Sequence, residues 1–328
     1  MSTATLRFLL FTILSVGSVV VGYAGRKRGW MREEWSRPIH FHTATWAWGL
    51  GCLLTLWLTP LKASNLWIIP IEMLVVIVPT AAIIWPARRL GYNRAQAGVL
   101  VAAGGISNVG FSFGGYLCYL LIQPADEAVA YAGAVTVVLT VTMILAIYPL
   151  ARHYGANAPG GMSVARLVLH NLLGAPAWPL YAAIIGLTLA LAKVSFPRFI
   201  TDWYLLDLVF YGTTVGAYLG AGLCLRFGAG ERYLGAYLVL AASHFVFGPL
   251  LCLAMLYGVG FTPWSIDPVA ARVLLFESAM PVGITCIILA NVFHLDTRMA
   301  CKVWLWNTVM FLVLLPLWMW LLRSPLMS

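Results

Sequence analysis

Two of the ten apolar stretches in this chain are interrupted in the middle by residues that disfavour a continuous helix. In the fourth stretch, near residues 95–122, the segment 104–115 carries five glycines. In the ninth, near residues 268–293, Pro281 lacks a backbone donor and clashes with the preceding turn, which favours a break. Lipid cannot satisfy the backbone groups that a break releases, so both breaks must lie within protein or face a water-filled cavity. This constraint predicts a membrane protein built around two internal breaks.

The composition excludes an ordinary soluble domain. Of the 328 residues, 62% are hydrophobic and 9% are charged, whereas soluble domains are about 25% charged. A bilayer core of about 30 Å is crossed by about 20 apolar residues in a helix. Stretches of about this length cover residues 5–24, 41–59, 66–87, 95–122, 128–151, 168–192, 203–225, 233–259, 268–293 and 299–322. We expect an all-α integral membrane protein with ten transmembrane helices, the first retained rather than cleaved as a signal peptide.

The basic residues are distributed unequally between the two sides of this layout. Most of the 20 Lys and Arg residues fall in the odd-numbered connections. The positive-inside rule makes these connections cytoplasmic and places both termini on the non-cytoplasmic side of a cell (plasma or inner) membrane. Because five is an odd number, the second five helices are inverted relative to the first. The predicted organisation is two inverted five-helix repeats, residues 1–153 and 165–328, joined by a short cytoplasmic linker at 154–164.

The two breaks occupy corresponding positions in these repeats, as the fourth and ninth helices. Interrupted helices at matching positions indicate the substrate site of a secondary transporter. The N-terminal end of a half-helix offers free N–H groups and a positive dipole, which suit an anion. The candidate substrate-binding residues are Ser107, Asn108, Gly110, Phe111, Ser278, Pro281 and Thr285. The alternative is that the glycines permit close helix crossing and that Asn108 only bridges helices.

Two acidic residues lie well inside the predicted spans. A carboxylate within the membrane is costly and is a functional hypothesis by default. Glu277 fits a proton-titrating coupling group or a structural anchor for freed N–H groups at the break. Glu72 lies in the outer third of its predicted helix, which favours a partly solvated structural role. His170 and His244 have no second ligand at metal spacing and are interpreted as structural.

Several other classes of function are disfavoured. The chain has no Walker loop and no H-E-x-x-H motif, and the G-x-S-x-G pattern at residues 110–114 lacks the strand that a nucleophile elbow requires. The six cysteines all lie in apolar stretches without a C-x-x-C pair, and the net charge of +9 is scattered over segment ends. We therefore expect no enzyme activity, no metal or other cofactor, and no nucleic acid partner. The expected partners are a small organic anion and the bilayer, with H⁺ or Na⁺ as the coupling ion and a homodimer left open.

Two short motifs resemble a known family. Asn108-Val109-Gly110-Phe111 resembles the N-x-G-F crossover of the auxin efflux carrier family of permeases, within the broader group that includes bile acid:sodium symporters. Glu277-Ser278-Ala279-Met280-Pro281 resembles its E-S-A-M-P crossover. The resemblance implies a scaffold domain and a transport domain that move elevator-fashion, and an organic anion as substrate. The chain departs from the family pattern at Phe113-Gly114-Gly115, where the family usually has G-x-P, and at Thr285, where it often has Asn.

The sequence thus predicts a secondary active transporter, a permease or efflux carrier of a small organic anion. Its site would lie between the two broken helices, with alternating access of the elevator type. One alternative is a non-transporting sensor or binding protein of the same fold, which the two departures favour. Another is a sodium-coupled symporter of the bile acid type.

Overall fold

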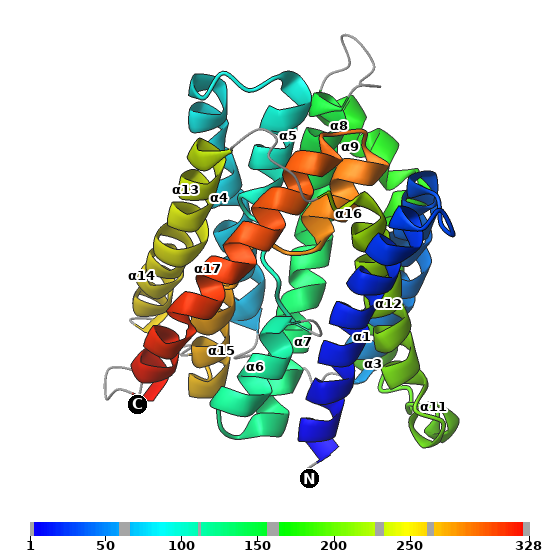
Figure 1. Ribbon diagram of the computed structural model, residues 1–328. Helices are drawn as coiled ribbons and strands as arrows, with labels where there is room; N and C mark the ends of the chain where they lie inside the picture. Colours follow the sequence, from blue (N-terminus) through cyan, green and yellow to red (C-terminus); the bar gives the residue numbers. More distant parts are fainter. Residues whose placement is uncertain are drawn as a thin grey trace.

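The computed structural model of the protein describes residues 3–58, 66–110, 113–155, 164–226, 233–260 and 266–323. Within these ranges every regular element is a helix, and the one β feature is an isolated antiparallel bridge between Ser107 and Val282. The long helices run side by side as a bundle, with both ends of the chain at the same end of the molecule (Figure 1). The part of the predicted linker at 156–163 and the candidate residue Phe111 lie outside the described residues.

Among the described residues, the first half of the chain contains eight α-helices. They are α1 (Thr3–Lys27), α2 (Ser36–His42), α3 (Trp48–Leu58), α4 (Ile68–Arg89), α5 (Arg94–Ala103), α6 (Phe113–Leu121), α7 (Ala125–Thr142) and α8 (Tyr148–Tyr154), with the short helix η1 (Glu33–Trp35) before α2. The start of α5 is fixed by a capping box, in which the side chains of Asn93 and Gln96 each accept a hydrogen bond from the other residue's backbone N–H.

The second half contains nine more helices and a short turn of 3₁₀ helix. They are α9 (Val164–Leu172), η5 (Ala175–Ala177), α10 (Trp178–Leu191), α11 (Arg198–Asp202), α12 (Leu205–Cys224), α13 (Leu234–Ala242), α14 (Gly248–Gly260), α15 (Pro268–Ser278), α16 (Thr285–Val292) and α17 (Thr297–Arg323). Asp267 caps α15 by accepting hydrogen bonds from the N–H groups of Val269 and Ala270, and Pro268 occupies the first turn.

Three of the long helices contain a single π-helical segment. These are η2 (Thr43–Ala47) between α2 and α3, η4 (Met143–Ile147) between α7 and α8, and η6 (Ser243–Phe247) between α13 and α14. A π turn widens the helix locally and rotates the side chains that follow it, and such turns are frequent at functional sites.

In the part of the chain that the structure describes, five helical segments are long and apolar enough to cross a membrane, by length and composition. They are Leu9–Lys27, Ile68–Arg89, Glu127–Tyr154, Leu234–Gly260 and Thr297–Leu322, and the pair Ala165–Leu172 and Ala175–Leu191 qualifies together with a bend of 77°. Large apolar side chains point outward from the bundle, as shown by Ile13 (64% exposed) and Val313 (75% exposed). These features are those of a membrane-embedded, all-helical protein, as the sequence predicted.

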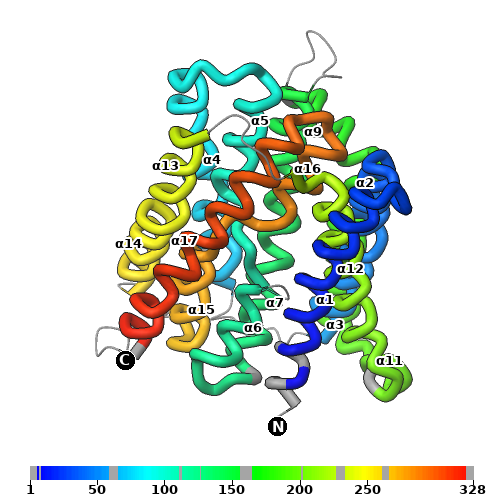
Figure 2. Tube along the Cα trace, in the orientation of Figure 1, coloured from blue at the N-terminus to red at the C-terminus, as the bar shows by residue number. Residues whose placement is uncertain are grey.

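The helices pack in two groups that each draw on both halves of the chain. In the first group α1 and α2 pack on α12, and α3 packs along α10. In the second group α4 packs on α5, α7 and α14, α15 packs on α7, and α16 packs on α5 and α17. Figure 2 shows α1, α3 and α12 on one side of the molecule and α4, α13 and α14 on the other.

Both interruptions that the sequence predicts are present. The fourth apolar stretch is divided into α5 and α6, and the ninth into α15 and α16. α15 ends at Ser278, just before Pro281, because the residue before a proline is disfavoured in the helical region. The non-helical segments between these half-helices position the candidate site.

Candidate functional site

The two helix breaks are hydrogen-bonded to each other through their backbones. The N–H of Asn108 donates to the carbonyl of Pro281 over 2.8 Å, and the N–H of Gly283 donates to the carbonyl of Ile106, also over 2.8 Å. Ser107 and Val282 lie opposite each other in this short antiparallel bridge. Each break therefore satisfies backbone groups that the other break has lost from its helix, which solves the problem of irregular backbone away from water.

Glu277 holds the break before α6. Its Oε1 accepts a hydrogen bond from the N–H of Gly110 over 2.8 Å and lies 3.9 Å from the Sγ of Cys118. The residue is completely buried, and its Oε2 has no hydrogen-bond partner among the described residues. The carboxyl group thus lies at the N-terminal end of α6, where the helix dipole favours negative charge. The sequence allows two roles for Glu277, proton coupling and structural anchoring. The hydrogen bond from the N–H of Gly110 is the contact that anchoring requires.

His244 on η6 contacts both breaks. Its Nε2 lies 2.8 Å from the carbonyl oxygen of Ala103, and its Nδ1 lies 3.0 Å from that of Met280 and 3.2 Å from the Oγ of Ser107. A neutral imidazole has one N–H. With that proton on Nε2, the ring donates to Ala103 and its Nδ1 accepts from the hydroxyl of Ser107, both at the first break. The side chain interpreted from sequence as an isolated structural histidine therefore lies between the two breaks and contacts both.

A third side chain, from α17, completes the support of the breaks. The Oδ1 of Asn307 accepts a hydrogen bond from the N–H of Val282 over 2.7 Å. Asn307 is 1% exposed, and its Nδ2 has no partner in the described part of the chain. The sequence analysis did not single out Asn307, although an amide within an apolar stretch of 27 helical residues is the kind of signal that marks buried polar contacts.

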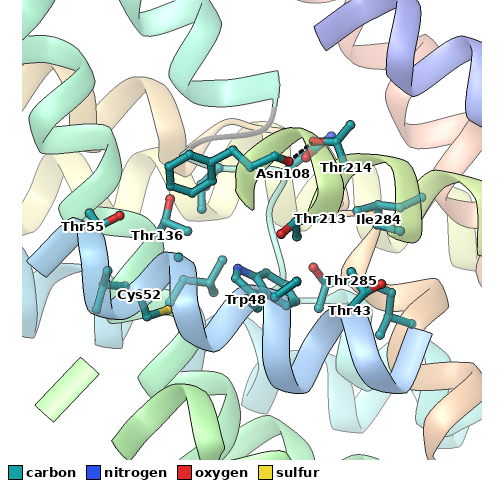
Figure 3. Close-up of a pocket in the computed structure, with 18 of the residues that line it drawn as sticks. Thr43, Trp48, Cys52, Thr55, Asn108, Thr136, Thr213, Thr214, Ile284 and Thr285 are labelled. Carbon is teal, nitrogen blue, oxygen red and sulfur yellow. Dashed lines mark hydrogen bonds between the residues drawn. The ribbon is translucent and has the colours of Figure 1, made fainter. Parts of the chain in front are cut away.

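A cavity of about 80 Å³ adjoins the paired breaks. Its walls come from η2, α3 and α12 on one side and from the breaks, α7 and α16 on the other. The polar side chains that line it are Thr43, Thr55, Ser107, Asn108, Thr136, Thr213, Thr214, Tyr218 and Thr285. Figure 3 shows Thr213, Thr285 and Trp48 around this space. None of the described residues that line the cavity carries a formal charge.

The two half-helix N-termini differ in what they offer this cavity. At α6, the N–H groups of Gly114 and Gly115 donate to the carbonyls of Asn108 and Gly110, and Glu277 closes the end. At α16, no acceptor in the described chain bonds the N–H groups of Ile284 and Thr285, and both residues line the cavity. Of the two half-helix N-termini, only that of α16 therefore offers free N–H groups to an anion in the cavity.

The structure places the candidate residues from sequence in different surroundings. Ser107, Asn108 and Thr285 line the cavity, and Asn108 makes a side-chain hydrogen bond with Tyr218. Ser278 and Pro281 do not line it. The Oγ of Ser278 donates to the carbonyl of Leu275 within its own helix over 2.7 Å.

Gly110 does not line the cavity, and its role is to give the backbone a conformation that other residues disfavour. Its φ is +68°, and a Cβ at this position would lie 1.2 Å from the Oγ1 of Thr136. Only glycine fits this combination of conformation and space.

The position of Glu72 corrects the expectation from sequence. A partly solvated carboxyl group is predicted from its place in the outer third of a helix, but Glu72 is 3% exposed. The first turns of α4 are covered because α4 packs against α14 and α15. Glu72 also interacts electrostatically with Glu277, which lies on the neighbouring helix α15.

Apart from Thr285, the threonines of the cavity escaped the sequence analysis. The hydroxyls of Thr136, Thr213 and Thr214 donate to carbonyls four residues earlier in their own helices, over 3.0, 2.7 and 2.9 Å. Threonine in an apolar helix commonly makes this local bond, so its presence carries no signal for a site. Their oxygens gather at one cavity only because three helices and two breaks converge there.

No protein-family model matches this chain, and a comparison with curated proteins finds no relative. Among the described residues, no group of three or more His, Cys, Asp or Glu side chains is placed to hold a metal ion. The chemistry available at the breaks is therefore that of hydroxyls, two amides, one imidazole, free backbone N–H groups and two buried carboxyl groups.

Proposed function

We propose that the protein is a secondary active transporter of a small organic anion, with the cavity beside the paired breaks as its substrate site. The observation that carries this proposal is the bonding of the two breaks to each other next to a cavity with free N–H groups at α16. Irregular backbone of this kind persists within a membrane only where it is buried in protein or lines a cavity, and transporters use it to bind substrate.

The donors around the cavity suit a carboxylate. Ile284 and Thr285 form the start of α16 and both line the cavity, which places the positive end of the α16 dipole there. Thr285 is 5% exposed, and its hydroxyl adds a donor to this lining. The absence of a cation among the described lining residues favours weak, reversible binding, which a carrier needs in order to release its substrate.

The packing of the helices supports an elevator-type movement. The cavity has α3 and α12 of the first helix group on one side and the breaks, with α7 and α16, on the other. A rigid shift of the second group along the first would carry the breaks and a bound anion together across the membrane. The proposal includes the ten-span arrangement as two inverted repeats, with cytoplasmic odd-numbered connections, and membership of the auxin efflux carrier family.

Coupling is assigned to the two buried acids. Glu277 accepts a hydrogen bond from Gly110 in the break between α5 and α6. Glu72, on the neighbouring helix α4, interacts with it electrostatically. Two like-charged carboxyl groups in one buried region cannot both ionise easily, so one of them holds a proton. Proton exchange at this pair would change the charge of the moving group, which is what a proton-coupled carrier requires.

The proposal is tested by flux in proteoliposomes. Purified protein is reconstituted, and uptake of a panel of labelled monocarboxylates and dicarboxylates is measured under a pH gradient, a sodium gradient or a membrane potential. At least one anion is expected to accumulate, and replacement of sodium by choline separates proton coupling from sodium coupling. If no anion moves under any gradient while one still binds, the non-transporting sensor is supported instead.

A substitution pair locates the site. Thr285→Val removes the cavity hydroxyl and keeps the shape of the side chain, and we expect KM to rise about tenfold, the loss of one hydrogen bond to a charged group. The matched control is Thr308→Val, because the hydroxyl of Thr308 donates to Trp304 in its own helix over 2.8 Å and Thr308 does not line the cavity. Equal effects of the two substitutions would place the substrate elsewhere.

A further inference from the structure

A second, larger cavity of about 750 Å³ lies at the meeting point of α2, α8, α9 and α16. Figure 2 shows α2, α9 and α16, and Figure 1 shows α8, at the end of the molecule opposite the two chain termini. Five basic side chains line this cavity: Arg37, His42, Arg152, His170 and His294. We call it the cationic vestibule. Its volume is in the range of cavities that hold small organic ligands.

No carboxyl group among the described residues offsets the charge of the vestibule. None of the described residues that line it is acidic, and within the described ranges neither Arg37 nor Arg152 forms an ion pair. Three acids lie close in sequence to these basic residues: Glu33, Glu34 and Asp296. Glu34 is exposed and does not line the vestibule. Glu33 pairs with Arg226 over 2.6 Å, and Asp296 accepts hydrogen bonds from Gln96 and from the N–H of Met299. A region lined by charges of one sign attracts ions of the opposite sign.

The basic groups are held in place on the wall nearest to α16. The guanidinium of Arg152 lies over the ring of Phe293, 5.6 Å from its centroid. His294 follows directly, with a φ of +56° in the left-handed conformation that ends α16, and it also lines the vestibule.

The vestibule is connected along α16 to the cavity beside the paired breaks, which we call the central cavity. A small cavity of about 10 Å³ between them shares Ile288 with the central cavity and shares Phe41 and Phe293 with the vestibule. Tyr148 also lines this narrow part, with its ring 5.3 Å from that of Phe293. Aromatic and aliphatic side chains therefore separate the cationic vestibule from the uncharged central cavity.

We propose that the cationic vestibule is a second anion-binding site, which takes a small ligand bearing carboxylate or phosphate oxygens through Arg37 and Arg152. Guanidinium groups form strong, charge-assisted hydrogen bonds with such oxyanions. Binding itself is independent of transport. A further role of the vestibule, as an entrance that concentrates anions before they pass Tyr148 and Phe293, rests on the proposed function.

The test is equilibrium binding to purified full-length protein, with succinate and inorganic phosphate as probes. Either anion is expected to raise the midpoint of thermal unfolding in a saturable way, because a ligand of the folded state stabilises it by mass action. Chloride at the same ionic strength is the reference for screening. In Arg37→Gln/Arg152→Gln the apparent affinity is expected to fall by about tenfold or more, since charge-assisted hydrogen bonds are lost. If the double variant does not fold, the single variant Arg37→Gln takes its place in the binding measurement, because the side chain of Arg37 is exposed.

The matched control is Arg28→Gln/Arg89→Gln. Both arginines are exposed and lie over tryptophan rings, Arg28 over Trp30 and Arg89 over Trp85, and neither lines the vestibule. The control removes the same charge and should keep the affinity of the unmodified protein. Equal losses in the two double variants, or no saturable shift beyond that of chloride, would overturn the proposal.

Two further arms separate the sources of the anion and the two sites. If the oxyanion comes from lipid, nanodiscs containing phosphatidylglycerol should stabilise the protein more than phosphatidylcholine alone, and the vestibule variant should lose that difference. If it is soluble, succinate or phosphate should act equally in both lipids. Thr285→Val should leave vestibule binding unchanged. Binding without flux would therefore refute the transporter and not the vestibule.

Discussion

At the scale of single residues, the paired breaks depend on a few buried polar groups. His244, Glu277 and Asn307 come from three different elements, and each bonds a backbone group that a helix has released. A buried backbone group that loses its partner destabilises the fold by its full desolvation free energy. These side chains therefore fix the shape of the breaks, while the threonines of the cavity leave that shape unaffected.

His244→Ala removes the ring that contacts both breaks. The carbonyl of Ala103 loses its donor, and the hydroxyl of Ser107 loses its acceptor. We expect a loss of about 2 kcal/mol or more in the free energy of unfolding, measured by thermal unfolding in detergent. His153→Ala, at an exposed ring on α8, is the control and should change little. A stable His244→Ala protein would show that the breaks do not need the ring.

Gly110→Ala tests the space at the first break. The added Cβ meets the Oγ1 of Thr136 in a left-handed backbone conformation. Gly29 also has a positive φ, of +77°, but a Cβ added there would have nothing within 4 Å. Gly29→Ala should therefore lower stability by about 1–2 kcal/mol, the conformational part alone, and Gly110→Ala by clearly more. Similar unfolding temperatures for the two variants would contradict the clash.

At the scale of elements, irregular helix turns coincide with the cavities. Residues of η2 line the central cavity, η6 presents His244 to the breaks, and Tyr148 follows η4 at the constriction below the vestibule. Local departures from the α-helix re-aim side chains without ending the helix. The half-helices behave differently from each other, since α6 is closed by Glu277 and α16 is open to the cavity.

Two substitutions of Glu277 separate anchoring from coupling. Glu277→Gln keeps an oxygen that can accept from the N–H of Gly110, whereas Glu277→Leu removes it. We expect the Leu variant to be less stable than the Gln variant by about 1–3 kcal/mol. Uptake driven by a pH gradient should be lost in both, because neither side chain can take up and release a proton. Gradient-driven uptake that survives in the Gln variant would assign Glu277 to anchoring alone.

At the scale of the whole molecule, a polar contact links the two helix groups. The Nδ2 of Asn291 on α16 donates to the Oγ of Ser36 over 2.7 Å and lies 3.2 Å from the Nδ1 of His40, both on α2. His40 also contacts the carbonyl of Ala217 on α12. A shift of one group along the other must break the contacts of Asn291.

Asn291→Ala is therefore expected to change the balance between conformations. Losing two hydrogen bonds worth about 1 kcal/mol each would shift a two-state equilibrium by about tenfold or more. Hydrogen exchange of α2 and α16 amides should become faster, while that of α4 should not. Unchanged exchange in α2 and α16 would show that this contact does not restrain the two groups.

The local chemistry of the chain determined the apolar helices and the position of both breaks. Pro281 and the glycines near Gly110 act within one or two turns, so their effect is visible without any partner. The same is true of the presence of Glu277 in an apolar stretch, which marked it as a functional candidate.

The tertiary structure alone decided how the breaks are satisfied and what surrounds the cavities. Gly110 and Glu277 are 167 positions apart in the chain, and no local pattern encodes their hydrogen bond. For the same reason the burial of Glu72, the contacts of His244 and Asn307, and the five basic side chains of the vestibule emerge only when distant helices pack. Helix formation follows from neighbours in sequence, whereas a site follows from neighbours in space.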